Sequence, residues 1–177
     1  MFQERIVIAD GQPLFREALA RLFLGNEPIV QVDYAATIVE AVQISENGPT
    51  PNMLILDFGY SGDSLELDLS ELRERFKHAF LILTSAINDI SAAQIALASG
   101  MNGFISKSLS GEEIWSALES VRRGNTVVRL DAADRIRHNS QSTGKMLTNR
   151  QNQILDLLSR GLSNKEIGNE LKISPFT

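Results

Sequence analysis

The sequence predicts an α/β fold in which helices cover both faces of a parallel sheet. Short apolar runs alternate with helical patterns, which makes five strand-helix units by about Gly124. The run from Met53 to Leu56 is apolar at every position, as expected for a central strand buried on both faces. Turn-forming stretches such as 48–51, with one glycine and two prolines, separate the units.

Local signals place each element in order. The expected strands are residues 6–9, 29–35, 53–57, 80–83 and 104–105. The expected helices are residues 13–24, 37–47, 64–77, 88–99 and 110–123. Pro13 suits the first turn of its helix. Thr37 with Glu40, and Ser110 with Glu113, have the spacing of capping boxes at two helix starts.

The polarity of the strands predicts their order. Residues 29–35 alternate apolar and polar side chains, as a half-exposed edge strand does, whereas the first, third and fourth strands are uniformly apolar. This difference favours the flavodoxin-like, doubly wound arrangement of five parallel strands in the order 2-1-3-4-5. Ligands bind at the carboxyl edge of such a sheet. The strand ends place four polar residues there: Asp10, Asp57, Thr84 and Lys107.

These residue types suit the formation of an acyl phosphate on a carboxylate. Asp57 would be the nucleophile, and Mg²⁺ held by Asp10 and Asp57 would neutralise phosphoryl oxygens. Lys107 would pair with the same charge. Thr84 could hydrogen-bond the phosphoryl group, and Phe104 could rotate into the space that the moving Thr84 leaves.

Composition limits the other classes of function. Cysteine is absent, which excludes disulfides and thiolate chemistry, and the two histidines show no ligand spacing. No apolar run is long enough to span a bilayer, so we expect a cytoplasmic protein with no membrane partner. The net charge of −5 is uneven, because residues 1–144 carry −7 and residues 145–177 carry +2.

The end of the chain predicts a second, smaller domain. Residues 1–124 form the α/β domain, and residues 125–146 form a linker that includes a polar stretch of small residues. Residues 147–177 show two short helical patterns joined by a turn at Gly161, and the start of a third at Pro175. This pattern predicts an all-α helix-turn-helix unit.

The four strand-end motifs in register resemble the receiver domain of NarL/FixJ response regulators over residues 5 to about 124. The resemblance implies that Asp57 accepts a phosphoryl group from a sensor histidine kinase and that Lys107 pairs with the phosphate. It also implies that Thr84 and Phe104 act as switch residues. The main-chain carbonyl of Gly59 would be a metal ligand, and the active protein would be a homodimer.

Residues 147–177 resemble the LuxR-type DNA-binding output domain that follows such receivers. The resemblance implies a transcription regulator, in which Lys165 and Thr177 could contact DNA phosphates. It stops at Thr177, where the recognition helix would begin. We therefore expect DNA binding from the full-length protein only, whether the chain is truncated or ends in an incomplete output domain.

Two alternatives remain open. Gly11 stands where the family usually has a second acid that coordinates the metal, so Mg²⁺ binding is expected to be weak. An atypical receiver would work without phosphorylation, through dimer contacts or a small ligand. The other alternative is a haloacid-dehalogenase-like phosphohydrolase, but Gly59 occupies the position of its second acid, and we expect no enzyme activity of that kind.

Overall fold

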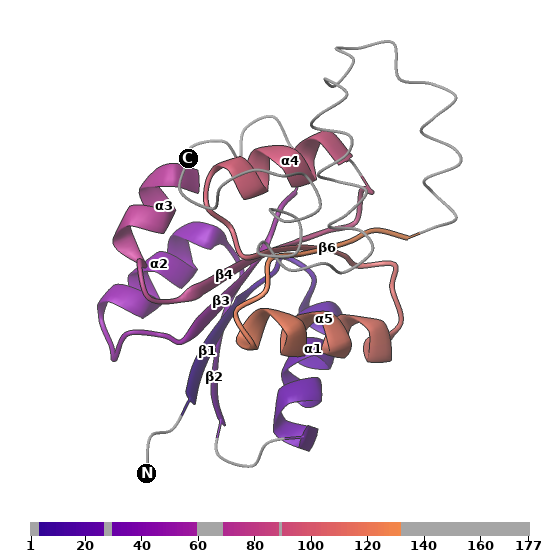
Figure 1. Cartoon of the computed structure of the whole chain (residues 1–177). Coiled ribbons are helices and arrows are strands. Elements are labelled where there is room, and N and C mark those ends of the chain that lie inside the picture. Colours follow the sequence, from indigo (N-terminus) through magenta and orange to yellow (C-terminus); the bar gives the residue numbers. More distant parts are fainter. Residues whose placement is uncertain (1–3, 27–29, 60–68, 89, 132–177) are drawn as a thin grey trace.

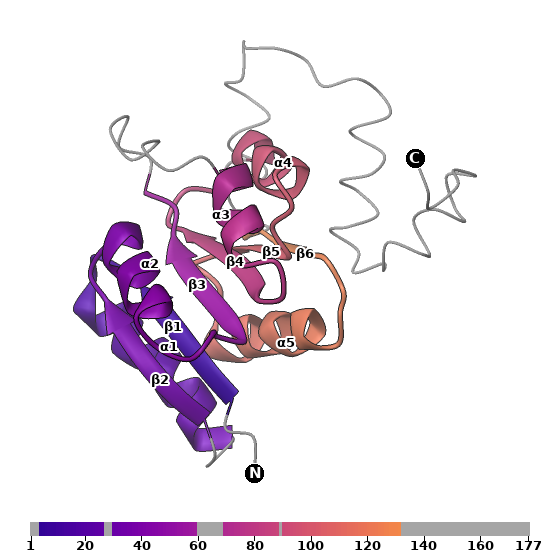
Figure 2. The same cartoon turned by 90° about the vertical axis from the view of Figure 1, so that its left-hand side faces the viewer.

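One parallel sheet organises the protein, with helices packed on both of its faces (Figures 1 and 2). The computed structural model describes residues 4–26, 30–59, 69–88 and 90–131. The strands are β1 (Glu4–Ala9), β2 (Val30–Ala35), β3 (Met53–Asp57), β4 (Phe80–Ser85), β5 (Gly103–Ser106) and β6 (Val127–Arg129). Their order is β2-β1-β3-β4-β5-β6, and every neighbouring pair is parallel.

Five helices connect the strands within the described residues. They are α1 (Pro13–Asn26), α2 (Ile38–Glu46), α3 (Leu69–Arg75), α4 (Ile90–Ala98) and α5 (Gly111–Arg122). Helices α1 and α5 cover one face of the sheet, and α2, α3 and α4 cover the other (Figure 1). The predicted start of the third helix, after residue 63, lies outside the described residues, as do residues 132–177.

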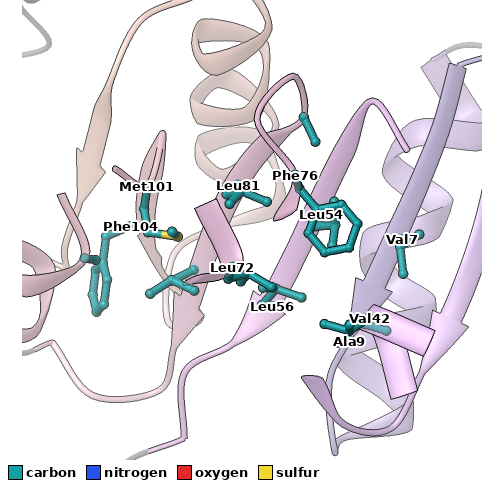
Figure 3. Packing of buried hydrophobic residues seen from close by; sticks show 14 of the residues in the cluster. Val7, Ala9, Val42, Leu54, Leu56, Leu72, Phe76, Leu81, Met101 and Phe104 are labelled. Atoms are coloured by element: carbon teal, nitrogen blue, oxygen red, sulfur yellow. The ribbon is translucent and has the colours of Figure 1, made fainter. Parts of the chain in front are cut away.

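Successive side chains of each central strand point to opposite faces of the sheet and so contribute to the hydrophobic clusters on both faces. In β1, Val7 and Ala9 belong to the cluster that packs under α2, α3 and α4, while Ile6 and Ile8 belong to the cluster under α1 and α5. Figure 3 shows the first cluster, which extends from Val7 and Ala9 at one end to Phe104 at the other. Strands that are apolar at every position are therefore buried on both faces, as their sequences predict.

The sheet has one strand more than the sequence predicted. The order 2-1-3-4-5 is confirmed, but β6 pairs with β5 through the register Gly103 to Val127 and Ile105 to Arg129. This strand lies in the range 125–146, which was predicted as linker. Three residues are too few to show a periodicity, so only pairing with β5 identifies them as a strand. The sheet therefore continues past Gly124.

The two predicted capping boxes differ in the structure. Ser110 Oγ accepts from Glu113 N at 3.3 Å, and Glu113 Oε2 accepts from Ser110 N at 2.9 Å, which completes the box at the start of α5. Hydrogen bonds from the Ser110 side chain and backbone lower the pKa of Glu113 below its usual value. At α2, Thr37 Oγ1 accepts from Glu40 N, as in a capping box. The Glu40 carboxylate, however, accepts from Ala36 N and not from Thr37 N, so the predicted box is only half formed.

Gly100, after α4, has a φ of +84°, and a Cβ there would lie 2.9 Å from Arg73 Cγ. Gly124, after α5, has a φ of +86° and open space around the same position. We expect Gly124→Ala to lower the free energy of unfolding by about 1 kcal/mol through backbone strain alone. Gly100→Ala should cost about 2 kcal/mol or more, because Arg73 must also shift. Urea unfolding of both variants measures the difference, and equal losses would contradict this packing.

Candidate phosphoacceptor site

The carboxyl edge of the sheet brings the four predicted polar residues together. Asp10 directly follows β1, Asp57 is the last residue of β3, and Lys107 directly follows β5. Thr84 is the register partner of Asp57 in β4. Main-chain hydrogen bonds extend the sheet past its ends, from Phe58 N to Thr84 O at 2.7 Å, and from the Lys107 amide to β4 at 2.8 Å. The backbone therefore holds these residues in place.

Lys107 forms ion pairs with both acidic residues. Its Nζ lies 2.7 Å from Asp10 Oδ2 and 2.7 Å from Asp57 Oδ1. The Lys107 and Asp10 side chains are only 6% and 1% exposed, whereas Asp57 is 25% exposed. Burial of this kind strengthens the pairing, because little water competes for the charges. Asp57 is therefore the acid that an incoming reagent can reach.

The two carboxylates differ in how they are held. Asp10 Oδ1 accepts from Gln12 N at 2.8 Å, which closes a turn at the start of the β1–α1 loop. Asp10 Oδ2 is in charge contact with Lys107 but has no directed hydrogen bond. Within the described residues, Asp57 Oδ2 has no ion-pair or hydrogen-bond partner. Both acids therefore keep one oxygen with unused acceptor capacity.

These residues fit a divalent cation with a small set of ligands. Two carboxylates and the carbonyl of Gly59 are oxygen donors of the kind that Mg²⁺ prefers. Among the described residues, no group of three acidic, histidine or cysteine side chains could hold a metal. Gly11 adds no donor, yet a Cβ there would meet only Ala36 O at 3.9 Å. The structure therefore has room for an acid at that position.

The predicted switch residues lie next to the site but are fully packed. Thr84 is buried, and its hydroxyl donates to Leu56 O over a long 3.4 Å. Phe104 is buried beside Met101 (Figure 3), and its ring lies 6.3 Å from the Phe58 ring in an edge-to-face arrangement. The Phe104 side chain is thus inside the core in this structure. Its role as a switch residue stays a prediction.

Two neighbours of Lys107 and Asp10 were missed by the sequence reasoning. The Phe15 ring centroid lies 5.0 Å from Lys107 Nζ. Arg16 Nη1 donates to Asp10 O at 2.6 Å and to Ala35 O at 3.2 Å, which ties the first turn of α1 to the ends of β1 and β2. Helical periodicity assigns Phe15 to the apolar side of α1, so the sequence alone gives no signal for a contact with a lysine of another element.

A polar network runs from the residues beside Lys107 to the end of β6. Ser106 Oγ lies 2.7 Å from Ser108 Oγ, and Asn88 Nδ2 donates to Ser108 Oγ at 3.4 Å. Asn88 Oδ1 in turn accepts from Asp131 N at 3.1 Å. The β4–α4 loop therefore holds the last described residue of the chain close to the site.

The chain matches two known protein families. Residues 6–119 match the response regulator receiver domain. The chain belongs to the response-regulator receiver family. Residues 145–177 match the luxR family of bacterial regulatory proteins. These two matches confirm the prediction of a two-component response regulator. In such a protein, a receiver is followed by a LuxR-type DNA-binding region. Regulators of this kind work with histidine kinases and DNA, and receivers generally bind Mg²⁺ for phosphorylation.

Sequence alignments with related proteins extend over almost the whole of this chain. The nitrate/nitrite response regulator NarL of Escherichia coli is 26% identical over 97% of this chain and 82% of its own length. The glycerol metabolism activator of Pseudomonas putida is 27% identical over 98% of this chain and 83% of its own length. In structure, Salmonella typhimurium RcsB has a TM-score of 0.63 at 19% identity, covering 98% of this chain and 86% of that one.

The family also limits what kind of protein this is. The family is one of transcription regulators and is in general non-enzymatic. The described part of the chain contains no helix with the length and apolar character needed to cross a membrane. Lys165 and Thr177, the predicted DNA contacts, lie outside the described residues. The roles of Asp57, Asp10, Gly59 and Lys107 stay predictions that this geometry supports.

Asn88→Ala should loosen the segment that leaves β6. Losing one hydrogen bond of about 1 kcal/mol would speed hydrogen exchange at the Asp131 amide roughly fivefold. Exchange measured by NMR checks this. Asn125→Ala is the matched control, because it removes an amide hydrogen bond to Ser120 Oγ at the other end of β6. Equal exchange at Asp131 in both variants would contradict the tethering role of Asn88.

Proposed function

We propose that this receiver is phosphorylated on Asp57 by a sensor histidine kinase and thereby controls dimerisation and DNA binding by residues 147–177. The observation that carries the proposal is the placement of Lys107 between Asp10 and Asp57, with 2.7 Å to each carboxylate. A buried ammonium beside a partly exposed carboxylate is suited to neutralise a phosphoryl group on that carboxylate.

In the proposed reaction, Asp57 Oδ2 attacks the phosphorus of a phosphohistidine in the kinase. The new bond joins Asp57 oxygen to phosphorus, and the phosphorus–nitrogen bond breaks, which leaves the histidine with the electron pair. Asp57 Oδ2 is suited to this attack because Lys107 holds Oδ1 instead. Lys107 then pairs with a phosphoryl oxygen and orients the product.

Asp10, Asp57 and the Gly59 carbonyl are the proposed ligands of a weakly bound Mg²⁺. The ion would supply positive charge to offset the phosphoryl oxygens. Because Gly11 gives no carboxylate, Asp10 is the one acid besides Asp57 in this ligand set. Its buried Oδ2 lacks a directed hydrogen bond, which leaves it free to change partner from Lys107 to a cation.

The output would follow from local rearrangement at β4 and β5. Thr84, whose hydroxyl has only a long hydrogen bond, would turn towards the phosphoryl group. Phe104 would adjust its packing, and the surface of α4, β5 and α5 would favour a homodimer. Two LuxR-type regions would then lie on paired DNA half-sites, with Lys165 and Thr177 at phosphates. We infer that the protein acts in the cytoplasm.

The proposed domain limits follow from the sheet. We expect the receiver to extend past Gly124 and to include β6, because β6 pairs with β5. The linker then runs from about residue 130 to 146, and the DNA-binding region from 147 to 177. The luxR family match begins at residue 145, close to this limit.

The phosphorylation-independent alternative is favoured by one observation. Gly11 leaves the metal site with two carboxylates, and the Lys107 ammonium neutralises part of their charge. A receiver of that kind would switch through dimer contacts or a small ligand. The phosphohydrolase alternative gains no support, because the family match is to receivers and Gly59 offers no acid for a leaving group.

Incubation with acetyl phosphate and Mg²⁺ should add the mass of one phosphoryl group to the parent protein. Asp57→Ala should take up none, because the nucleophilic carboxylate is absent. Intact-mass spectrometry measures both, and a parallel sample with a chelator tests the metal. An adduct on Asp57→Ala would place the phosphoacceptor elsewhere, and no adduct on either protein would favour the phosphorylation-independent receiver.

Gly11→Asp should tighten Mg²⁺ binding roughly tenfold or more, because it adds a charged oxygen ligand where the structure has space. Isothermal titration calorimetry measures the affinity, and intact mass measures the faster phosphoryl uptake. Gly11→Asn is the matched control, with the same size and no charge, and should give a smaller gain. Equal affinity in the parent and Gly11→Asp would show that Gly11 is not beside the metal.

A further inference from the structure

Phe15 brings an aromatic ring to the one buried cation of the site. It lies in the first turn of α1, two residues after Pro13, and its half-buried side chain packs against the core cluster under α1 and α5. Its ring centroid lies 5.0 Å from Lys107 Nζ, within the range of a cation–π interaction. Phe15 therefore belongs both to the core and to the site.

The surroundings of the ammonium make this contact strong. The Lys107 side chain is 6% exposed, and its ammonium is in charge contact with Asp10 Oδ2 and Asp57 Oδ1. The ring adds a third electron-rich contact where little water is present. A cation–π interaction contributes more when the cation is desolvated, as it is here.

The ring is also held in a fixed place. Arg16, the next residue, donates to the carbonyls of Asp10 and Ala35 and so ties the first turn of α1 to two strand ends. Pro13 fixes the backbone at the start of the helix. The backbone that carries the ring is therefore anchored beside the site, which suits the ring to define a position for the cation.

We propose that Phe15 is a positioning residue that holds the Lys107 ammonium over the Asp57 carboxylate, where it meets the incoming phosphoryl group. This inference rests on the proposed function of Asp57. The contact with the ring positions Lys107 without the help of a metal ion. This independence is useful in a chain where Gly11 provides no side-chain ligand for the metal. When Asp57 becomes phosphorylated, the ring keeps the ammonium close as its partner changes from carboxylate to phosphoryl oxygen.

The test distinguishes the effect of the aromatic face of Phe15 from the effect of its packing in the core. Phe15→Leu keeps an apolar side chain but removes the aromatic face, and Phe15→Tyr keeps the face. Phe23→Leu is the matched control: Phe23 is on the same helix and fully buried, and its ring stacks edge-to-face on Trp115, with centroids 5.4 Å apart. Phe23→Leu should destabilise the same core cluster without touching Lys107.

Trace labelling of lysines with acetic anhydride, read by peptide mass spectrometry, reports how well the ammonium is held. Lys77, which is 63% exposed, is the internal reference. We expect labelling of Lys107 relative to Lys77 to rise roughly threefold to tenfold in Phe15→Leu, and to stay at the parent level in Phe15→Tyr and Phe23→Leu. The rate of phosphoryl uptake from acetyl phosphate should fall by a similar factor in Phe15→Leu alone.

Each outcome has one meaning. Unchanged Lys107 labelling in Phe15→Leu, or an equal rise in Phe23→Leu, would overturn the positioning role. Raised labelling with an unchanged uptake rate would show that the ring holds Lys107 but does not serve phosphoryl transfer, which also overturns the proposal. If the parent protein takes up no phosphoryl group while the labelling contrast holds, the proposed function fails and the contact between Phe15 and Lys107 stands.

Discussion

The double ion pair of Lys107 is the interaction on which the site depends. A buried ammonium without partners would be costly, and so would two neighbouring carboxylates without a cation. Lys107 meets both requirements by lying 2.7 Å from Asp10 and from Asp57. The three strand ends that carry these residues must therefore stay in register. The parallel sheet provides that register through β1, β3 and β5, with β4 between the last two.

The same arrangement explains how a reaction at Asp57 could reach the rest of the chain. Lys107 is flanked by Ser106 and Ser108, and Ser108 connects through Asn88 to the amide of Asp131. This network begins at the two sequence neighbours of Lys107 and ends at Asp131, two residues after β6. The route passes through side chains with directed hydrogen bonds, which have discrete arrangements and so suit a switch.

The loss of an acid at Gly11 changes the balance of charge in the site. In the proposed function, the lysine would supply a larger share of the positive charge here than in a receiver with more carboxylates. The Phe15 ring lies 5.0 Å from that lysine's Nζ, and Arg16 ties the first turn of α1 to the main chain at Asp10. The proposed phosphoacceptor site would then depend less on the metal. The physical requirement is that charge be neutralised, and either cation can contribute to that.

Local sequence determined the strands, most helices and the identity of the strand-end residues. Uniformly apolar runs favour strands buried on both faces, as in β3, and the mixed polarity of β2 favours an edge strand. Tertiary structure alone decided the pairing of β6, the bridge from Lys107 to two acids, and the contacts of Phe15 and Asn88. These features join residues far apart in the chain, through strand register and rotamers, and local periodicity carries no information about either.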